Sequence, residues 1–248
     1  MEVHHHTSAP DKKFTHYIWE FIMLFLAVFC GFLAENQREH MIERQQEKQY
    51  IRSLQEDLSR DISQIDSIQF ELIQFISVID SIAADFNDLK EYRPALTTIK
   101  QLSGGMGFRD FIYNDRTIQQ LKNAGNMRLI RNLAVADSIT EYDSRVRRGK
   151  VHQDLVNEIY LPKIKDKIKY IINTTLMNKL TTADLDEAGI NSLMQNILLT
   201  HDKTELIRFV NEMNEYRSQI RYQLGFVTHD KEEAQRLLTL IKKEYRLN

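Results

Sequence analysis

Three features of the sequence predict an all-α fold. The 248 residues include only 3 prolines and 8 glycines, which is below average usage and disfavours a many-stranded sandwich or barrel. Residues 21–34 form an unbroken run without charge or proline, and apolar residues recur every seven positions from Ile51 to Phe86. Together these features predict one N-terminal transmembrane helix that continues into a long helix, which packs in an elongated helical bundle.

The composition excludes several classes of protein. The formal net charge is -2, so the chain as a whole has no electrostatic attraction for nucleic acid. Cys30 is the single cysteine, which excludes an intramolecular disulfide framework and a multi-cysteine zinc site. We therefore expect no nucleic-acid partner and no cofactor.

We predict a transmembrane helix at residues 17–36. The uncharged run and the four residues before it reach the lower limit for a spanning helix, and Tyr17 and Trp19 stand where an interfacial aromatic belt would lie. A buried core helix is the less favoured interpretation, because the segment is apolar on every face. A cleaved signal peptide is also disfavoured, because Phe32 stands where a cleavage site after Ala34 would need a small residue.

Small residues within this segment suggest helix–helix contact. Ala27, Gly31 and Ala34 lie at positions i, i+4 and i+7, on one face of a helix. Such a face lets a second helix approach closely. It favours a homo-oligomer, although patterns of this kind also arise by chance.

Glu20 is an acid in the first turn of the predicted span. An acid inside a bilayer is costly and is a candidate functional group. Glu20 lies only about one turn inside the boundary, so the favoured interpretation is that its carboxylate reaches the lipid headgroups. A proton-binding or inter-subunit role is the alternative.

The chain divides into four predicted parts. Residues 1–16, which include the His4–His6 run, form an N-terminal tail; residues 17–36 span the membrane; residues 37–50 form a polar helical stalk; and residues 51–248 form the bundle domain. Basic residues are nearly balanced on the two sides of the span, so they do not decide its orientation. We expect a single-pass protein of a bacterial inner membrane, with the C-terminal domain extracytoplasmic.

Helix boundaries in the bundle follow from local signals. The stripe from Ile51 is wider than a two-position coiled-coil seam, which favours a bundle face, and Pro94 should end this helix at about Tyr92. Residues 103–107 predict a loop. A short helix should begin at Asn114 or Asp115, one of which caps it, and close at Gly125. Another helix should follow Asn132, with a break or kink at Pro162. The next helix should cover Ile164 to Leu176, and a weaker helical stretch should cover residues 193–198.

The C-terminal segment allows two interpretations. Asp202 with Glu205 has the spacing of a capping box and opens a helix. Either Gly225 ends that helix and Asp230 caps a last one, or a single helix of about 44 residues runs through both.

Parts of the sequence resemble a bacterial family of single-span membrane proteins of unknown function. The resemblance lies in an acid beside an aromatic at the start of the span, in residues 33–37 (LAENQ), in residues 47–58 (EKQYIRSLQEDL) and in residues 118–132 (IQQLKNAGNMRLIRN). It covers less than half of the chain. It implies membrane anchoring and a helical C-terminal part, and it carries over no catalytic residues.

Candidate chemical sites are weak. His201-Asp202 and His229-Asp230 resemble the His-Asp pairs of helical metal phosphohydrolases, but both aspartates are better explained as helix caps. Five basic residues form a possible patch for an anionic partner: Arg145, Arg147, Arg148, Lys150 and Lys163. A solvated helix balanced by acids elsewhere is the favoured alternative.

No catalytic set appears in the sequence, so we expect a protein without enzymatic activity. The sequence favours a membrane-anchored helical scaffold or interaction protein. We expect it to form an oligomer in contact with membrane lipid and a protein partner. The alternative is a membrane sensor or ion-conducting oligomer that uses Glu20 in its span.

Overall fold

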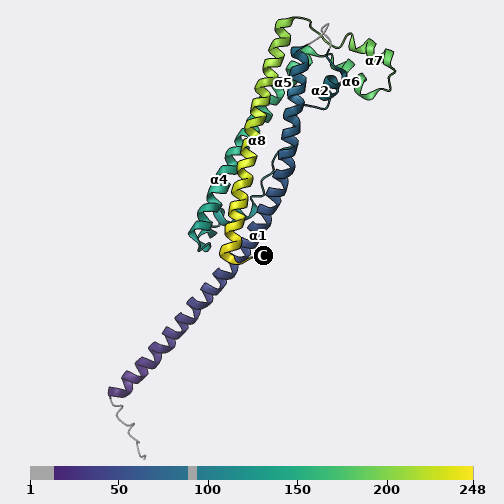
Figure 1. The fold of residues 1–248 in the computed structure, drawn as a ribbon. Helices are drawn as coiled ribbons and strands as arrows, with labels where there is room; N and C mark the ends of the chain where they lie inside the picture. Colours follow the sequence, from purple (N-terminus) through teal and green to yellow (C-terminus); the bar gives the residue numbers. More distant parts are fainter. Residues whose placement is uncertain (1–13, 89–93, 248) are drawn as a thin grey trace, which may run out of the picture. The chain divides into compact units, whose positions relative to one another are not determined.

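The computed structural model describes residues 14–88 and 94–247. Within these ranges the fold is all-α, with no strand beyond one isolated bridge between Ile172 and Leu198 (Figure 1). The chain forms two compact units, residues 1–50 and residues 51–248. Helix α1 (Phe14–Asn87) contributes to both units.

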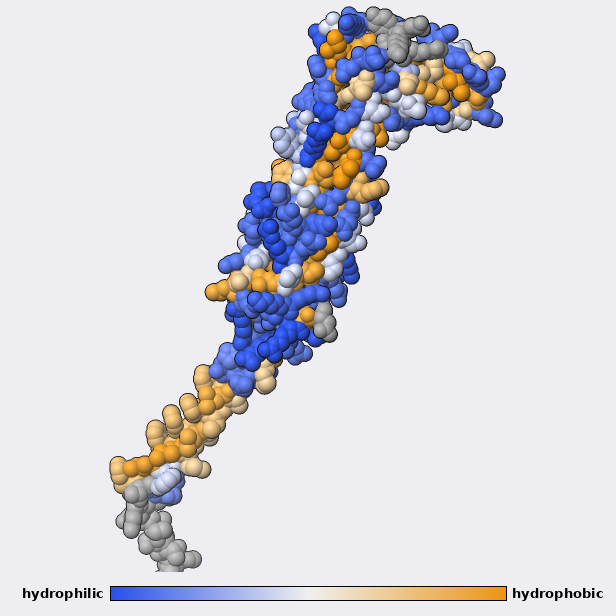
Figure 2. Space-filling model, in the orientation of Figure 1, coloured by the Kyte–Doolittle hydropathy of each residue, from blue (hydrophilic) through white to orange (hydrophobic). Residues whose placement is uncertain are grey.

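The first unit contains the candidate membrane span. Helix α1 begins at Phe14, so the last residues of the predicted tail are helical; residues 1–13, with His4–His6, lie outside the described residues. None of the most apolar stretch is buried, and Figure 2 shows apolar residues over the visible surface of this part of α1. Phe25 stacks on Phe21 and Phe29, with ring centroids 6.4 and 5.9 Å apart. The helix is long and apolar enough to cross a bilayer.

The second unit is a helical bundle. It contains the rest of α1, α4 (Leu133–Leu155) and α8 (Lys203–Tyr245), with α4 and α8 packed on each other. Helices α1 and α8 are antiparallel, because Phe86 meets Phe209 with ring centroids 4.7 Å apart, while Gln69 donates to Thr228 at 2.8 Å. The seven-residue stripe of α1 is buried throughout, which confirms the predicted bundle face; its members are Ile51, Leu58, Ile65, Leu72, Ile79 and Phe86.

In the first half of the bundle domain, the helices begin and end close to the predicted positions. Helix α1 ends at Asn87, five residues before the predicted end; Tyr92 lies outside the described residues. Helix α2 (Leu96–Ser103) leads into the predicted loop, and α3 (Arg116–Asn123) is followed by Gly125, whose φ of 64° suits glycine. A short 3-10 turn (Asn126–Leu129) precedes α4, whose N-terminus is capped by the side chain of Asn132.

The helix is interrupted next to Pro162, as predicted, and the interruption is a π-helical turn rather than a loop. Helix α4 passes through a π-helical turn (Val156–Tyr160) into α5 (Leu161–Ile171). Proline has no N–H, so the carbonyl of Glu158 cannot receive the usual helical bond, and a wider turn accommodates this loss. The helix predicted to reach Leu176 is in fact two, because α6 (Thr174–Thr182) starts anew after the cap at Asn173; α7 (Glu187–Met194) covers part of the weak stretch predicted next.

The C-terminal segment is one helix. The side chain of Asp202 accepts hydrogen bonds from the backbone N–H groups of Thr204 and Glu205, at 2.7 and 3.4 Å, as predicted. Helix α8 then runs 43 residues without interruption, and Gly225 lies in its interior. Of the two interpretations, the single helix is therefore correct. The assignment of Asp230 as a second cap is wrong, because Asp230 is a buried residue within the helix.

Candidate functional site

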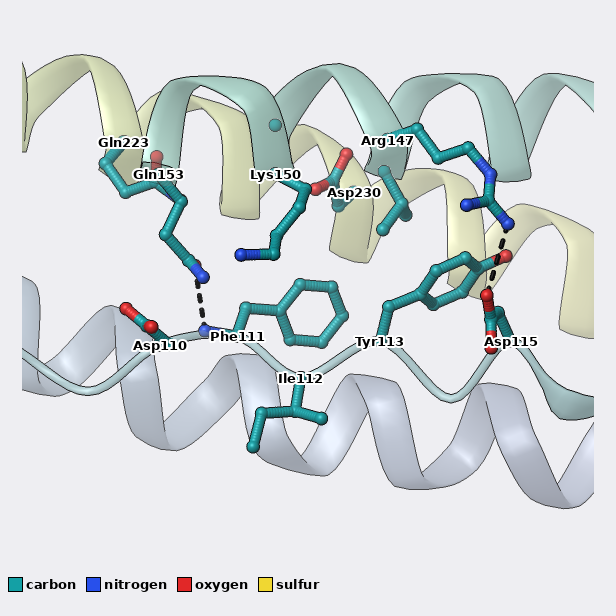
Figure 3. A pocket seen from close by; sticks show the side chains of 12 residues that line it. Asp110, Phe111, Ile112, Tyr113, Asp115, Arg147, Lys150, Gln153, Gln223 and Asp230 are labelled. Carbon is teal, nitrogen blue, oxygen red and sulfur yellow. Dashed lines mark hydrogen bonds and ion pairs between the residues drawn. The ribbon is translucent and has the colours of Figure 1, made fainter. Parts of the chain in front are cut away.

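A cavity of about 330 Å³ lies within the bundle domain. Its walls come from α4, α8 and the extended segment 110–115 between α2 and α3 (Figure 3). In Figure 3 the rings of Phe111 and Tyr113 stand above the extended segment, and Lys150 and Gln153 reach toward them from α4. The cavity is lined by Asp110, Phe111, Ile112, Tyr113, Asp115, Val146, Arg147, Gly149, Lys150, Gln153, Gln223 and Asp230.

Side chains hold the extended segment in place. The backbone N–H of Phe111 donates to Gln153 Oε1 at 2.9 Å. Gln64 of α1 bonds both backbone groups of Ile112, at 2.6 and 3.0 Å. Because these bonds come from two different helices, the segment is fixed across the bundle although it has no regular structure of its own.

Asp61 is a fully buried acid beside this segment. Its carboxylate accepts hydrogen bonds from the Tyr142 hydroxyl at 2.7 Å and from the side-chain and backbone nitrogens of Asn114 at 2.7 and 3.0 Å. Burial raises the pKa of Asp61 above its ordinary value, although the hydrogen bonds from Tyr142 and Asn114 oppose the rise. The residue thus joins α1, α4 and the extended segment.

Asp57, one helical turn before Asp61, caps α3 from another helix. Its Oδ2 accepts from the backbone N–H and the hydroxyl of Thr117, at 3.3 and 2.5 Å. Asp115 occupies the position before the helix, but its side chain makes no capping bond and pairs with Arg147 at 3.2 Å instead. The predicted local cap at Asn114 or Asp115 is therefore wrong, because a buried acid from α1 already satisfies the helix terminus.

Asp143 anchors the cationic edge of the cavity. It is buried on α4 and accepts from Lys122 Nζ at 2.6 Å, from Arg147 Nε at 3.0 Å and from the Tyr113 hydroxyl at 3.3 Å. Burial alone would raise the pKa of Asp143, but the hydrogen bonds from Arg147 and Lys122 outweigh it and lower the pKa. Asp143 is therefore ionised and compensated.

Asp230 has a different environment. It is 1% exposed, and its Oδ1 has no hydrogen-bond partner in the described part of the chain. Burial raises the pKa of Asp230 to about 7, while Arg145 and Arg148 oppose the rise. Gln153, also 1% exposed, has no partner for its Nε2 among the same residues. The cavity therefore has one buried acceptor and one buried donor that the described side chains leave unsatisfied.

The predicted basic patch is divided among several ion pairs. Lys163 lies on α5, with its ammonium 2.7 and 2.9 Å from carboxylates of Glu212 and Glu215. The guanidinium groups of Arg145 and Arg148 lie 3.7 and 3.9 Å from Glu141. Lys150 pairs with Asp154, and Arg147 pairs with Asp143. This pairing supports the balanced-helix interpretation, and only Arg147 and Lys150 line the cavity.

The candidate functional residues of the span are exposed on α1; they are Glu20, Ala27, Gly31 and Ala34. The Nε2 of His16 lies 3.0 Å from Glu20 Oε1, one helical turn away. A β-carbon added to Gly31 would meet nothing within 4 Å, so the face formed with Ala27 and Ala34 is open.

The two His-Asp pairs do not come together as a site. Asp202 caps α8, whereas His229 is exposed and faces Glu232 at 3.3 Å. Across the residues that the structure describes, no group of three or more His, Cys, Asp or Glu side chains could hold a metal ion.

Sequence reasoning missed the buried polar residues. One signal was present: Asp61 stands seven residues after Leu54 and seven before Ile68, in a register otherwise filled by apolar side chains. An acid in such a position is buried only with partners. Gln153 and Asp230 carry no comparable signal.

No protein-family model, no curated protein and no solved structure matches this chain. The family resemblance of residues 33–37, 47–58 and 118–132 therefore stays a prediction.

Proposed function

We propose that this chain is a single-pass, bilayer-anchored interaction protein of a bacterial inner membrane, without catalytic activity of its own. The observation that carries the proposal is the apolar stretch of α1, of which no residue is buried within the described structure. A surface of this size and hydrophobicity is unfavourable in water and favourable in hydrocarbon. The bundle domain would then be held beside the membrane.

The anchor is tested by substituting Leu24 and Val28 with arginine in the full chain. Two charges near the centre of a span strongly oppose insertion. The wild-type chain should remain in carbonate-washed membranes, and the double variant should move to the soluble or aggregated fraction. The matched control is Met41→Arg with Ile42→Arg, two exposed positions beyond the predicted span, which should stay in the membrane. A wild-type chain in the soluble fraction would refute the anchor.

Orientation is tested with a single new cysteine. Lys243 is exposed on α8, so a Lys243→Cys chain should react with a membrane-impermeant maleimide in intact cells if the bundle domain is extracytoplasmic. The wild-type chain, with Cys30 inside the bilayer, should not react. Labelling of Lys243→Cys only after cell lysis would place the domain in the cytoplasm.

Self-association would use the face of Ala27, Gly31 and Ala34. Gly31→Leu should reduce crosslinked dimers in membranes, because leucine blocks close approach of a second helix. Phe29→Leu, on the other side of the helix, should leave crosslinking unchanged. Only monomers in the wild-type chain would exclude the oligomer.

A protein partner has exposed apolar side chains to contact. Phe70 and Ile73, three residues apart on the bundle part of α1, are 66% and 53% exposed. A Phe70→Ser and Ile73→Ser chain should lose proteins that copurify with the wild-type chain from native membranes. The same copurified set with both chains would exclude this face as the contact.

The second candidate function is a sensor or ion-conducting oligomer that uses Glu20. The neighbouring His16 gives this acid a titratable partner 3.0 Å away, which favours a role in proton binding. Glu20→Gln should change proton flux in reconstituted vesicles while crosslinking persists. Unchanged flux would remove this candidate.

A further inference from the structure

We propose that the cavity between α4, α8 and the extended segment 110–115 binds a small molecule that carries a primary ammonium group and an oxygen acceptor, such as an amino alcohol or amino acid. This site goes beyond the proposed anchoring function and does not depend on it. It is assigned from the chemistry of its buried walls.

The size of the cavity suits a small ligand. Its volume of about 330 Å³ lies at the lower end of the range for small-molecule pockets. Gly149 keeps the space beside Asp230 open, because a β-carbon there would stand 3.1 Å from Asp230 Oδ2. The ring of Phe111 and the side chain of Val146 supply apolar wall.

The unsatisfied atoms define the ligand. Asp230 Oδ1 is a buried acceptor and Gln153 Nε2 a buried donor, and neither has a partner among the described residues. The orientation of Gln153 follows from its Oε1, which accepts from the Phe111 N–H. A ligand ammonium would donate to Asp230, and a ligand oxygen would accept from Gln153.

The charges around Asp230 favour a cationic ligand. The charged groups that act most strongly on it are Arg145 and Arg148 of α4, His229 of α8 and Asp61 of α1. Arg147, Lys150, Asp110 and Asp115 line the same cavity. Arg145 and Arg148 both lie within ion-pair distance of Glu141, so they already have an acid to compensate. Arg145, His229 and Arg148 offset only part of the cost of burying the Asp230 carboxylate, and an ammonium beside it would offset more.

An entering ligand would displace the exposed side chain of Lys150. Lys150 lines the cavity and pairs with Asp154, and both side chains are about half exposed. Exposed ion pairs contribute little to stability, so an entering amine can replace this contact.

The test is calorimetric titration of the detergent-solubilised full chain. Ethanolamine, which has both groups, should bind saturably; ethylamine, which lacks the oxygen, should bind several-fold more weakly; and ethylene glycol, which lacks the amine, should not bind. The affinity for ethanolamine should rise about tenfold from pH 6 to pH 8, because Asp230 ionises across that interval. This measurement needs no variant.

Variants then locate the site. Asp230→Asn should abolish binding of ethanolamine, and Asp137→Asn, which changes an exposed acid on α4, should retain it. Circular dichroism checks that both variants are folded. No saturable heat at millimolar ethanolamine, equal binding of ethylene glycol, pH-independent binding, or full binding by a folded Asp230→Asn chain would each overturn the proposal, and none of these results bears on membrane anchoring.

Discussion

The carboxylate of Asp230 lies directly against Gly149 on the neighbouring helix. A β-carbon on Gly149 would stand 3.1 Å from Asp230 Oδ2 and 3.4 Å from the Cβ of Phe226. Both atoms belong to α8, so Gly149 permits α4 and α8 to approach closely at this level.

Gly149→Ala and Gly225→Ala should therefore have opposite effects on stability. At Gly149 the crowding against α8 should outweigh the better helix propensity of alanine and lower the free energy of unfolding by about 1 kcal/mol. A β-carbon at Gly225 meets nothing within 4 Å, so alanine there should raise it by roughly 0.5–1 kcal/mol. Denaturant titration followed by circular dichroism measures both; a change of the same sign in the two variants would contradict the close approach.

Asp230→Asn should change the pH dependence of stability. The pKa of Asp230 is raised from 3.8 to about 7 by burial, so between these values the folded chain binds its proton more tightly than the unfolded chain. This group therefore makes the free energy of unfolding fall as pH rises from about 4 to 7, by up to about 4 kcal/mol. The asparagine variant should lack this decline and be more stable than the wild type at pH 8. Equal pH profiles of the two chains would show that Asp230 ionises normally.

Asp57→Ala should destabilise the bundle because it removes the cap of α3. The buried N–H and hydroxyl of Thr117 lose their acceptor, and the expected cost is roughly 2–4 kcal/mol. Glu56→Ala, at the exposed neighbouring position, should change stability by less than about 0.5 kcal/mol. Similar midpoints for the two variants in thermal unfolding would argue against the cap.

Tyr142→Phe should cost more at neutral pH than in acid. Its hydroxyl donates to the buried Asp61 at 2.7 Å and so opposes the rise in the pKa of Asp61 that burial causes. Without this donor the pKa of Asp61 should rise further, so the variant should lose about 1–2 kcal/mol at pH 7 and less in acid, because the bond to the ionised carboxylate matters less as Asp61 takes up its proton. Tyr222→Phe, at an exposed position, is the control. A loss that does not change with pH would show that only packing is affected.

Local signals predicted the parts of the fold that depend on neighbouring residues. The apolar stripe of α1, the stop at Gly125, the helix that starts after Asn132 and the cap at Asp202 each follow from residues a few positions apart along the chain. The same local reasoning located the interruption at Pro162, although not its π-helical form, and it failed at Asp230, whose surroundings resemble a cap only in sequence.

The cavity was not predicted because its contacts join distant positions. Asp57 caps a helix 60 residues away, and Gln153 holds a backbone group 42 residues away. Such pairs leave no periodic pattern in a single sequence. Only Asp61, an acid within an apolar register, gave any local indication of a buried polar cluster.

The manner in which segment 110–115 is secured has an evolutionary consequence. Its main-chain groups are bonded by Gln64, Asp61 and Gln153, and those bonds are indifferent to the side chains that Phe111 and Tyr113 carry. Substitutions at Phe111 and Tyr113 can therefore change one wall of the cavity while the surrounding helices keep their register. Descendants of this chain would be free to diverge in what they accommodate without having to redesign the framework.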